Sequence, residues 1–326
     1  MKICNIHFNF FNILKFYPLR ATTLPKNNLT RQCSNNTKEK LNPYWVTGFS
    51  DAEGCFTVSI SRRSNLSNSW NISTSFEINL HTKDLSILLQ LKKFFGVGIV
   101  STKPNRNISV FRVTKNKDLL NVIIPHFLKY PLISQKYSDF VLWSKVVEMI
   151  KNKEHLTPLG FKKVLSFYSS INRGASKTVS NLFPDIVKAQ RPVFALPLVL
   201  DPNWVSGFSA GDAGFSIGVR ITTGQIYFRF HIAQHSRDRE MIKLFISFFK
   251  CGRVNVRGNR CDFYVQDMSK IAEFITPHFK YYPLENIKHL DYLDFVKGLE
   301  LFKKGGKNNI KEIRDIISGM NSKRKF

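Results

Sequence analysis

Hydrophobic and polar residues alternate in short stretches along the chain, and turn residues separate these stretches from segments with helical spacing. In the first half, Phe56, Val58 and Ile60 alternate with polar neighbours, and residues 69 to 80 repeat the pattern. A period of two is typical of a strand with one wet face. A helix is predicted over residues 84 to 95, and a second hairpin near residues 97 to 114. The apolar residues that predict this helix are Leu85, Leu88, Leu89 and Phe95.

The same order of segments returns in the second half of the chain. Residues 45 to 50, Trp-Val-Thr-Gly-Phe-Ser, recur at 204 to 209 as Trp-Val-Ser-Gly-Phe-Ser. The tetrapeptide His-Thr-Lys-Asp at 81 to 84 recurs as His-Ser-Arg-Asp at 235 to 238. Such self-similarity sets the architecture before any local pattern does. The residues expected to face inward on strands of the second copy are Phe215, Ile217, Val219, Ile221, Val254 and Val256.

These patterns predict an α+β fold with repeats at residues 41 to 172 and 201 to 326. Each repeat is expected to run helix, hairpin, helix, hairpin, helices, with helices covering one side of its sheet. The linker at residues 173 to 200 carries three prolines but is too apolar for full disorder, so we expect it to lie along one or both repeats. Residues 1 to 40 are expected to be a poorly ordered leader, either a weak match to an organellar transit peptide or a translated upstream segment.

Composition narrows the class of partner. The chain has 326 residues, with 49 Lys and Arg against 23 Asp and Glu, a formal charge of +26 that is spread along the whole length. A distributed basic surface favours a nucleic acid, because each neutralised phosphate releases counterions, although a ribosomal or merely basic protein is the alternative. The five cysteines form no pattern with zinc spacing, which disfavours a zinc finger. No apolar run approaches the ~20 residues that cross a bilayer, so we expect a soluble protein.

Each copy's opening helix ends in an acid, Glu53 in the first and Asp212 in the second. Small residues on these helices would let the two backbones approach closely and bring both acids into one site. Two carboxylates at adjacent helix C-termini repel one another and the helix dipoles, so a cation is needed. A hard divalent ion bound by carboxylate and carbonyl oxygens fits this site and could serve phosphodiester hydrolysis. The small residues are Gly48, Ala52, Gly207 and Gly211.

Residues 46 to 54 and 205 to 213 resemble the two signature helices of monomeric LAGLIDADG homing endonucleases of the organellar, intron-encoded type. The resemblance covers about residues 41 to 320 and includes the Tyr-Pro-Leu segments before Lys136 and Lys288. It implies a pseudo-twofold pair of αββαββα repeats, each with a four-stranded antiparallel, saddle-shaped sheet backed by helices, and the motif helices at the interface. It also implies that the sheets follow the major groove, that the acids straddle the minor groove, and that both DNA strands are cut.

The resemblance further implies roles for individual residues. Glu53 and Asp212 match the metal-binding acids, and the carbonyls of Ala52 and Gly211 match secondary ligands of Mg²⁺, for which Mn²⁺ is a plausible substitute. Lys136 and Lys288 match basic residues near the scissile phosphates, and Lys83 and Arg237 match positions that organise active-site water. The second copy departs from the motif at Ala213, where glycine is expected. If that position needs a positive φ, alanine would add strain.

Outward-facing strand residues are candidates for contact with the major groove, where Arg, Asn and Gln can pair with base edges. In the first copy they are Thr57, Ser59, Ser61, Arg63, Asn71, Ser73, Ser75, Glu77, Asn79, Ser101, Lys103 and Arg112. In the second copy they are Ser216, Arg220, Thr222, Gln225, Tyr227, Arg229, His231, Arg253, Asn255, Arg257, Tyr264 and Gln266. His81 and His235 stand at equivalent places after a strand, where packing or helix entry is favoured over catalysis.

The predicted function is a site-specific endonuclease that acts as a monomer on a long stretch of double-stranded DNA. The alternatives are an intron maturase, which would bind the host intron RNA with or without cleaving DNA, and a DNA-binding regulator. An acid retained in both motif helices favours cleavage, because a pure binder needs no clustered carboxylates. The abundance of Lys, Asn, Ile and Phe suggests an AT-rich genome, which points to a mitochondrion first and a chloroplast second.

Overall fold

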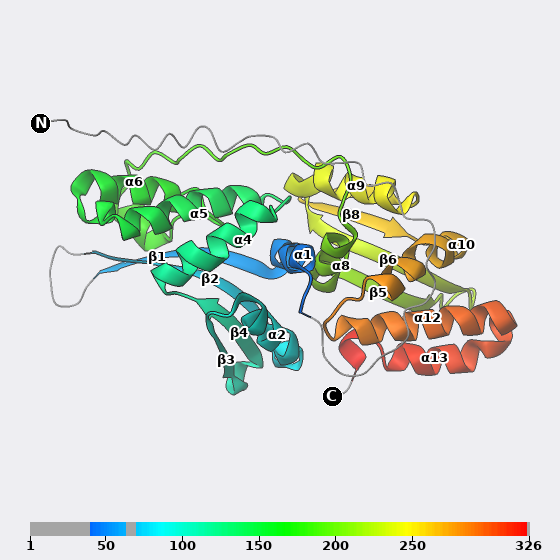
Figure 1. Cartoon of the computed structure of the whole chain (residues 1–326). Coiled ribbons are helices and arrows are strands. Elements are labelled where there is room, and N and C mark those ends of the chain that lie inside the picture. Colours follow the sequence, from blue (N-terminus) through cyan, green and yellow to red (C-terminus); the bar gives the residue numbers. More distant parts are fainter. Residues whose placement is uncertain (1–39, 63–69, 325–326) are drawn as a thin grey trace, which may run out of the picture. The chain divides into compact units, whose positions relative to one another are not determined.

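The computed structural model describes residues 40–62 and 70–324, so the predicted leader lies outside the described residues. Figure 1 shows one series of elements that occurs twice along the chain. In the first copy the structure has α1 (Pro43–Glu53), β1 (Gly54–Arg62), β2 (Trp70–His81), η2 (Thr82–Asp84), α2 (Leu85–Phe95), β3 (Ile99–Lys103), η3 (Pro104–Arg106), β4 (Ile108–Val113), α3 (Asn116–Asp118), η4 (Leu119–Ile123), α4 (Ile124–Lys129), α5 (Lys136–Lys151), η5 (Glu154–Leu156) and α6 (Pro158–Tyr168).

The second copy repeats this order after the short helix α7 (Lys177–Leu182). Its elements are α8 (Pro202–Asp212), β5 (Ala213–Val219), β6 (Ile226–His235), η6 (Ser236–Asp238), α9 (Arg239–Phe249), β7 (Arg253–Arg257), β8 (Arg260–Val265), α10 (Met268–Lys270), η7 (Ile271–Ile275), α11 (Thr276–Tyr281), α12 (Lys288–Gly305), η8 (Gly306–Asn309), α13 (Ile310–Ser318) and η9 (Asn321–Lys323).

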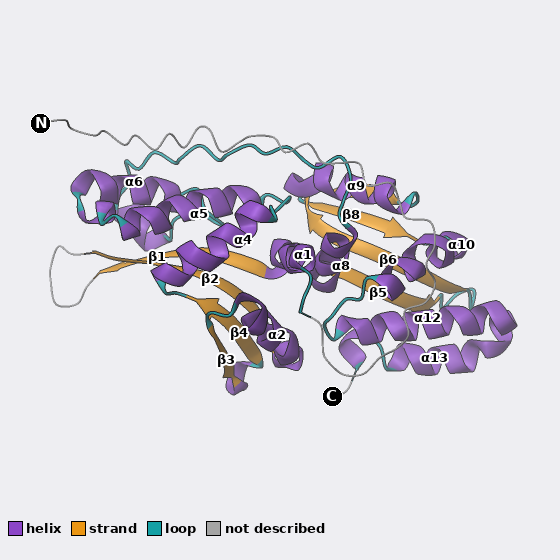
Figure 2. Cartoon of the chain, in the orientation of Figure 1, coloured by secondary structure: helices purple, strands orange, loops and turns teal. Residues whose placement is uncertain are grey.

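Each copy builds one four-stranded antiparallel sheet, in the order β1-β2-β4-β3 and β5-β6-β8-β7. The registers correspond, since Phe56 lies opposite Phe76 and Phe215 lies opposite Phe230. Helices α2 and α5 pack on the first sheet, and α9 and α12 pack on the second (Figure 2). The predicted pair of α+β repeats, each with a helix-backed antiparallel sheet, is confirmed.

The same aromatic cluster fills both cores. Phe56 is fully buried, and its ring centroid lies 5.1 to 5.4 Å from four other aromatic rings. Its counterpart Phe215 has four ring neighbours at 5.2 to 5.7 Å. Aromatic burial on this scale dominates core energetics. The neighbours are Phe76, Phe127, Phe140 and Trp143 in the first copy and Phe230, Phe279, Tyr292 and Phe295 in the second.

The motif helices α1 and α8 begin at side-chain caps. Asn42 accepts a hydrogen bond from the backbone N–H of Tyr44, and Asp201 accepts from those of Asn203 and Trp204. Each helix has a proline at its first position, where the missing N–H has no intrahelical partner to lose. Both helices run without a turn into the first strand of their sheet, so the acid at each helix end is placed at a strand start.

Glycine lets α1 and α8 touch backbone to backbone. A Cβ on Gly48 would lie 2.1 Å from the Trp204 carbonyl oxygen, and one on Gly207 would lie 2.0 Å from that of Trp45. Further along, the Cβ of Ala52 lies only 2.3 Å from where a Cβ on Gly211 would stand. The sequence prediction that small residues bring the two helices together is confirmed, and the two helices lie side by side in Figure 1.

A hydroxyl group ties each motif helix to its own repeat. Thr47 Oγ1 donates to the Tyr130 carbonyl (3.0 Å) and lies 3.2 Å from His126 Nε2. Ser206 Oγ makes the same pair of contacts in the second copy. Burial lowers the pKa of His126 to about 4 and keeps the ring neutral. Because the Thr47 hydroxyl gives its proton to the Tyr130 carbonyl, its oxygen is left to accept a hydrogen bond from His126 Nε2.

An asparagine near the end of each copy has the same backbone conformation and makes the same hydrogen bond. Asn172 and Asn321 both have left-handed backbone, with φ of 52° and 56°. Their backbone N–H groups donate to the buried Asp139 and to Asp291, at 2.9 and 2.8 Å. Asparagine tolerates this conformation better than other side chains do. The structural repeat therefore extends beyond the segments that recur visibly in the sequence.

The linker is fixed to the first copy by polar contacts. Arg191 donates to Asp139 Oδ1 at 2.6 Å and to the Gln135 carbonyl at 2.9 Å. Ser138 Oγ donates to the Pro192 carbonyl at 2.8 Å, and the Phe194 ring lies 5.1 Å from that of Tyr137. The linker thus lies along the first repeat, as expected. In the described part of the chain, no helix has the length and apolarity to span a membrane.

One inward-facing prediction is wrong. β5 ends at Val219, so Ile221 lies in the following turn and is fully exposed. Val256 lies opposite the buried Cys261 and so faces inward as predicted, but it is 40% exposed because β7 is an edge strand. Leu89, one of the residues whose spacing predicted the helix, is 51% exposed because the buried stripe of α2 runs through its neighbours at positions 87, 88, 91 and 95. The spacing of apolar residues cannot show which of them are buried when leucine also occurs on the exposed face of the helix.

The helix contact predicts the effect of adding one methyl group. Gly207→Ala should lower the free energy of unfolding by about 3 kcal/mol or more, because the new Cβ meets backbone that cannot move aside. Gly319→Ala is the matched control, since its Cβ has 3.7 Å to the nearest atom, and it should change stability by less than about 1 kcal/mol. Urea unfolding of both variants tests this, and equal effects would contradict the backbone contact.

Candidate active site

Two acids stand at the adjoining ends of the motif helices. Glu53 is the last residue of α1 and Asp212 the last of α8. The site predicted to bind metal lies here, and Glu53 Oε1 is 3.3 Å from where a Cβ on Gly211 would stand. The residues after the acids, Gly54 and Ala213, have φ of −71° and −85°. The position does not need a positive φ, so the strain considered for Ala213 does not arise.

Two lysines enter the site from the first turns of α5 and α12. Lys136 Nζ donates to the carbonyl oxygens of Ser50 (3.2 Å) and Ala52 (3.0 Å). Lys288 Nζ donates to the carbonyls of Ser209 (3.3 Å) and Gly211 (2.5 Å). Each ammonium therefore covers the negative end of a motif-helix dipole, where the last carbonyls lack intrahelical partners.

Burial and charge shift the ionisation of all four groups. Burial first, and then the Glu53 charge, raises the pKa of Asp212 to about 6. Burial also raises the pKa of Glu53, against the opposing effects of Lys288 and Lys136. Burial lowers the pKa of Lys288 to about 8 and that of Lys136 in the same direction. Such shifts concentrate where carboxylates and amines are held together out of water, which is typical of functional sites.

The two acids have different neighbours. Gln234, at the end of β6, donates a side-chain amide hydrogen bond to Asp212 Oδ2. The equivalent residue in the first copy is Leu80, which has no such donor. The sequence analysis missed Gln234, because comparing the copies at this position gave a polar residue against an apolar one. The half-sites are therefore chemically unequal.

A second carboxylate, Asp51, fixes the first motif helix and was also missed. Its buried oxygens accept four hydrogen bonds, from the Ile133 N–H (3.0 Å), the Ser134 N–H (3.2 Å) and hydroxyl (2.6 Å), and Trp204 Nε1 (2.9 Å). Trp204 belongs to α8, so this bond crosses between the repeats. Asp51 holds the segment before Lys136 against the helix whose carbonyls that lysine contacts.

The second copy has Ala210 where the first has Asp51. Trp45 Nε1, the counterpart of the Trp204 donor, is buried without a hydrogen-bond partner. Asn286 partly replaces the missing contacts by donating Nδ2 to the Ala210 carbonyl at 2.9 Å. An unpaired buried donor costs about 1–3 kcal/mol, so the second half is less well satisfied than the first.

The donor set fits a hard divalent cation. It consists of two carboxylates and two carbonyls, all oxygen, which is what Mg²⁺ prefers. Among the residues that the structure describes, no group of three or more His, Cys, Asp or Glu side chains is placed to hold a metal. Coordination would thus have to be completed by water and a phosphate, as in sites where the substrate itself is a ligand.

The outer face of the first sheet carries most of its predicted contact residues in accessible positions. Arg63 lies outside the described residues, and Ser75 is a correction, because it is 8% exposed beneath its neighbours. Ser75 Oγ donates to Glu77, which in turn pairs with Arg112 at 2.9 Å. The half-buried or exposed members are Thr57, Ser59, Ser61, Asn71, Ser73, Glu77, Asn79, Ser101, Lys103 and Arg112.

In the second copy, three predicted strand residues lie in the turn between β5 and β6. They are Arg220, Thr222 and Gln225, and the short β5 is the reason. The remaining candidates are half-buried or exposed on the sheet or just after it. They are Ser216, Tyr227, Arg229, His231, Arg253, Asn255, Arg257, Tyr264 and Gln266.

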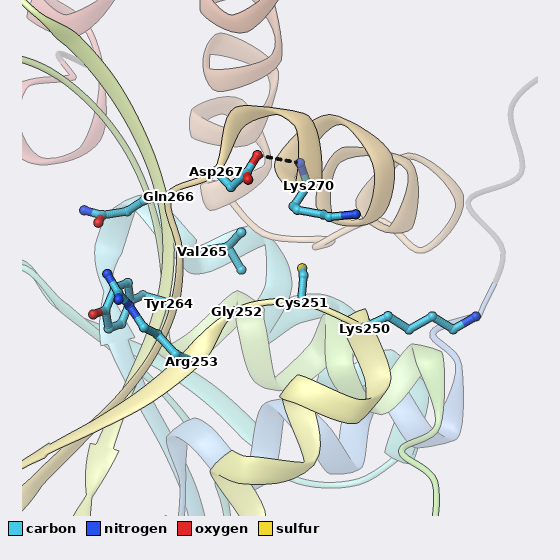
Figure 3. A pocket seen from close by; sticks show the side chains of 9 residues that line it. All are labelled: Lys250, Cys251, Gly252, Arg253, Tyr264, Val265, Gln266, Asp267 and Lys270. Atoms are coloured by element: carbon cyan, nitrogen blue, oxygen red, sulfur yellow. Dashed lines mark hydrogen bonds between the residues drawn. The ribbon is translucent and has the colours of Figure 1, made fainter.

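A basic pocket opens at the outer edge of the second sheet (Figure 3). Lys250, Arg253 and Lys270 line it together with Tyr264. The guanidinium groups of Arg253 and Arg229 lie 4.8 and 5.0 Å from the centre of the Tyr264 ring. Stacking of this kind fixes flexible arginines in place while leaving their hydrogen-bond donors for a phosphate or a base edge.

The two histidines after the strands act at helix entry, as predicted. His81 Nδ1 accepts the Lys83 backbone N–H at 3.2 Å, and His235 Nδ1 accepts that of Arg237 at the same distance. The side chains of Lys83 and Arg237 are exposed, and Arg237 Nε lies 3.6 Å from Asp238. These contacts fix the backbone of the segment that leads from the sheet into the next helix.

The LAGLIDADG endonuclease family model matches residues 46–147 and again residues 205–299. This chain belongs to the LAGLIDADG endonuclease family. A probable intron-encoded endonuclease 2 of Neurospora crassa is 35% identical over 334 residues, which span 96% of this chain and 74% of that protein. An uncharacterized 50.9 kDa protein in ND4 intron 1 of Podospora anserina is 40% identical over 134 residues, or 40% of this chain and 29% of that protein.

Solved structures give the same result. The I-SmaMI LAGLIDADG homing endonuclease bound to cleaved DNA has a TM-score of 0.83 and 35% identity, covering 88% of this chain and 99% of I-SmaMI. I-SmaMI bound to an uncleaved DNA target in the presence of calcium ions has a TM-score of 0.81 and 34% identity, covering 86% and 99%. The maturase alternative is not favoured, since the Neurospora relative is named as an endonuclease and I-SmaMI is solved with DNA.

The raised pKa of Asp212 predicts how the metal-free LAGLIDADG protein responds to pH. A folded-state pKa near 6, above the unfolded value near 4, means that this group contributes stability at low pH and loses it as pH rises through 6. The Asp212→Asn variant cannot titrate there. In EDTA it should be more stable than wild type at pH 7.5, by about 2 kcal/mol, and this advantage should shrink as pH falls towards 4.5.

Urea unfolding at several pH values measures the difference directly. Subtracting the two proteins removes the contributions of carboxylates that do not interact with Asp212. Glu53 does interact with it, so any change in the ionisation of Glu53 is part of the measured difference. A difference that stays constant from pH 4.5 to 7.5 would show that Asp212 ionises normally.

Proposed function

We propose that this chain is a site-specific, metal-dependent DNA endonuclease that hydrolyses both strands of a long double-stranded target. The observation that carries the proposal is the meeting of Glu53 and Asp212 at the ends of two helices that touch backbone to backbone, flanked by two half-buried lysines. Family membership and the resemblance to I-SmaMI bound to DNA support it. We propose that the chain acts as a monomer, because one chain supplies both acids.

Glu53 and Asp212 would hold Mg²⁺, with the carbonyls of Ala52 and Gly211 as further oxygen donors. When bound, the divalent cation supplies Lewis-acid polarisation of a phosphate oxygen and charge neutralisation. A carbonyl oxygen has two lone pairs, so each of these carbonyls can accept a lysine proton and still face a cation. The calcium ions named with I-SmaMI support divalent-ion use in the family, and Mn²⁺ is the natural substitute.

Lys136 and Lys288 would stabilise the charge that develops on the two scissile phosphates. Each ammonium is already held at the motif-helix end by two carbonyls, so little reorganisation is needed during the reaction. A pKa near 8 also leaves Lys288 able to give up or take a proton close to neutral pH. We propose that Lys83 and Arg237, on the segments after β2 and β6, order water at the edge of the site.

The outer sheet faces would bind the major groove through the residues placed above. Their arginines, asparagines and glutamines can each contribute ~1–3 kcal/mol of discrimination between bases, whereas the lysines add sequence-independent phosphate contacts. With a formal charge of +26, binding should weaken steeply as salt rises. We propose a mitochondrial location, which the description of the Podospora relative as an ND4 intron product supports.

Removing either acid charge should separate cleavage from binding. Glu53→Gln and Asp212→Asn should each slow cleavage at least a hundredfold, because the metal loses a carboxylate ligand, while DNA affinity stays equal or rises as repulsion of phosphate is relieved. A supercoiled plasmid carrying the intron-less sequence of the host gene, or a target selected from a random library, is the substrate. Cleavage is followed with and without Mg²⁺.

Glu300→Gln is the matched control, because it removes an exposed carboxylate from α12, twelve residues beyond Lys288. It should cleave like wild type. Cleavage by wild type in EDTA, or full activity in both acid variants, would exclude the proposed metal site. Binding without cleavage by wild type under every metal condition would leave a DNA-binding regulator as the function.

A further inference from the structure

Two aspartates stand where sequence rules place the cap of their own helix, yet they do not cap it. Asp84 is the N-cap residue of α2 and Asp238 that of α9, and neither side chain makes a capping hydrogen bond to the helix that follows. Aspartate at this position ordinarily accepts from an N–H in the first turn. Both carboxylates are turned to another partner instead.

That partner lies in the opposite repeat. Asp238 Oδ1 accepts the backbone N–H of Gln135 at 2.7 Å, and Asp84 Oδ1 accepts that of Ile287 at 3.2 Å. Gln135 and Ile287 are the N-cap residues of α5 and α12, and neither side chain caps its own helix. In α5 the next N–H, that of Lys136, donates to Ser134 Oγ of the same repeat at 3.1 Å. Each repeat thus supplies the carboxylate that accepts the N-cap N–H of a helix in the other repeat.

The capped helices are the ones that begin with the active-site lysines. Lys136 directly follows Gln135, and Lys288 directly follows Ile287. A carboxylate at a helix N-terminus stabilises the first turn by hydrogen bonding and by the helix dipole. Here it also fixes the residue from which a buried ammonium reaches the end of a motif helix.

Resting on the proposed function, we infer that Asp84 and Asp238 are positioning residues that act across the repeat interface. Asp238 of the second repeat holds Lys136 of the first half-site, and Asp84 of the first repeat holds Lys288 of the second. Neither aspartate touches DNA or metal in this assignment. As a consequence, cleavage of each DNA strand depends on both repeats. One repeat supplies the lysine, and the other supplies the aspartate that positions it.

Strand-resolved nicking of the plasmid target tests the inference. Asp238→Ala should change the ratio of the two first-nick products about five- to tenfold, in the direction that Lys136→Met changes it. Asp84→Ala should shift the ratio the opposite way, as Lys288→Met does. The double variant should cut both strands slowly with a ratio near wild type. DNA affinity should stay within about twofold in all of them.

Matched controls distinguish the positioning of the lysines from the general effect of losing a helix cap. Asp267 caps α10 within its own repeat, by accepting the N–H groups of Ser269 and Lys270, so Asp267→Ala loses a cap without touching a lysine helix. It should leave the nicking ratio unchanged. Asp238→Asn keeps the Oδ1 acceptor and should cut both strands in the wild-type ratio. Equal slowing of both strands by Asp84→Ala and by Asp238→Ala would mean that the aspartates only stabilise the interface, and would overturn the inference.

Amide hydrogen exchange provides a readout that does not depend on cleavage. In Asp238→Ala the Gln135 amide should exchange at least tenfold faster while the Ile287 amide keeps its wild-type rate, and Asp84→Ala should give the reverse. Unchanged protection would overturn the trans contact. If wild type fails to cleave but these exchange changes occur, the proposed function is wrong and the cross-repeat cap remains.

Discussion

The backbone contact between α1 and α8 is the constraint on which the rest of the structure depends. At Gly48 and Gly207 each helix comes so close to a carbonyl of the other that no side chain fits between them. Because both helices run directly into their sheets, this contact fixes where each sheet begins and brings the terminal acids together. Repulsion between two acids at helix C-termini is the cost, and the half-buried lysines Lys136 and Lys288 offset part of it.

The two repeats share one fold but need not carry the same side chains, and at one pair of positions on the motif helices the same side chain cannot stand in both. Ala52 and Gly211 face each other so closely that the methyl group of one excludes a methyl group on the other. The two copies also differ at positions next to this contact. Asp51 is replaced by Ala210, which leaves the Trp45 indole unpaired, and Leu80 is replaced by Gln234, which hydrogen-bonds Asp212. Fusion of two copies in one chain permits such divergence, whereas a homodimer would have to place the same residue at both sites.

Sequence alone predicted the repeats, the sheets, the helix contact and the two acids, because each leaves a periodic or duplicated pattern. It failed at a strand end that is set by a turn and at polar contacts that only one copy makes. The end of β5 depends on a turn that spacing does not show, which misplaced Ile221, Arg220 and Thr222. Asp51 and Gln234 were missed for a different reason, since each is polar in one copy and replaced by an apolar residue in the other, so comparison of the copies gave no signal.

The cross-repeat hydrogen bonds explain why an aspartate stands three residues after the histidine in both copies, as Asp84 after His81 and Asp238 after His235. A cap within a repeat would make each copy self-sufficient, and either acid could then be replaced by any residue that caps its own helix. In this chain the carboxylate acceptors are exchanged, so an isolated repeat would leave the N–H of Gln135 or Ile287 without its acceptor and its own aspartate without the N–H that it accepts. Burial raises the pKa of both aspartates, which shows that their surroundings penalise an unpaired charge. The two halves are therefore held together by these exchanged hydrogen bonds as well as by the glycine contact, and Lys136 and Lys288 directly follow the two residues whose N–H groups are bound.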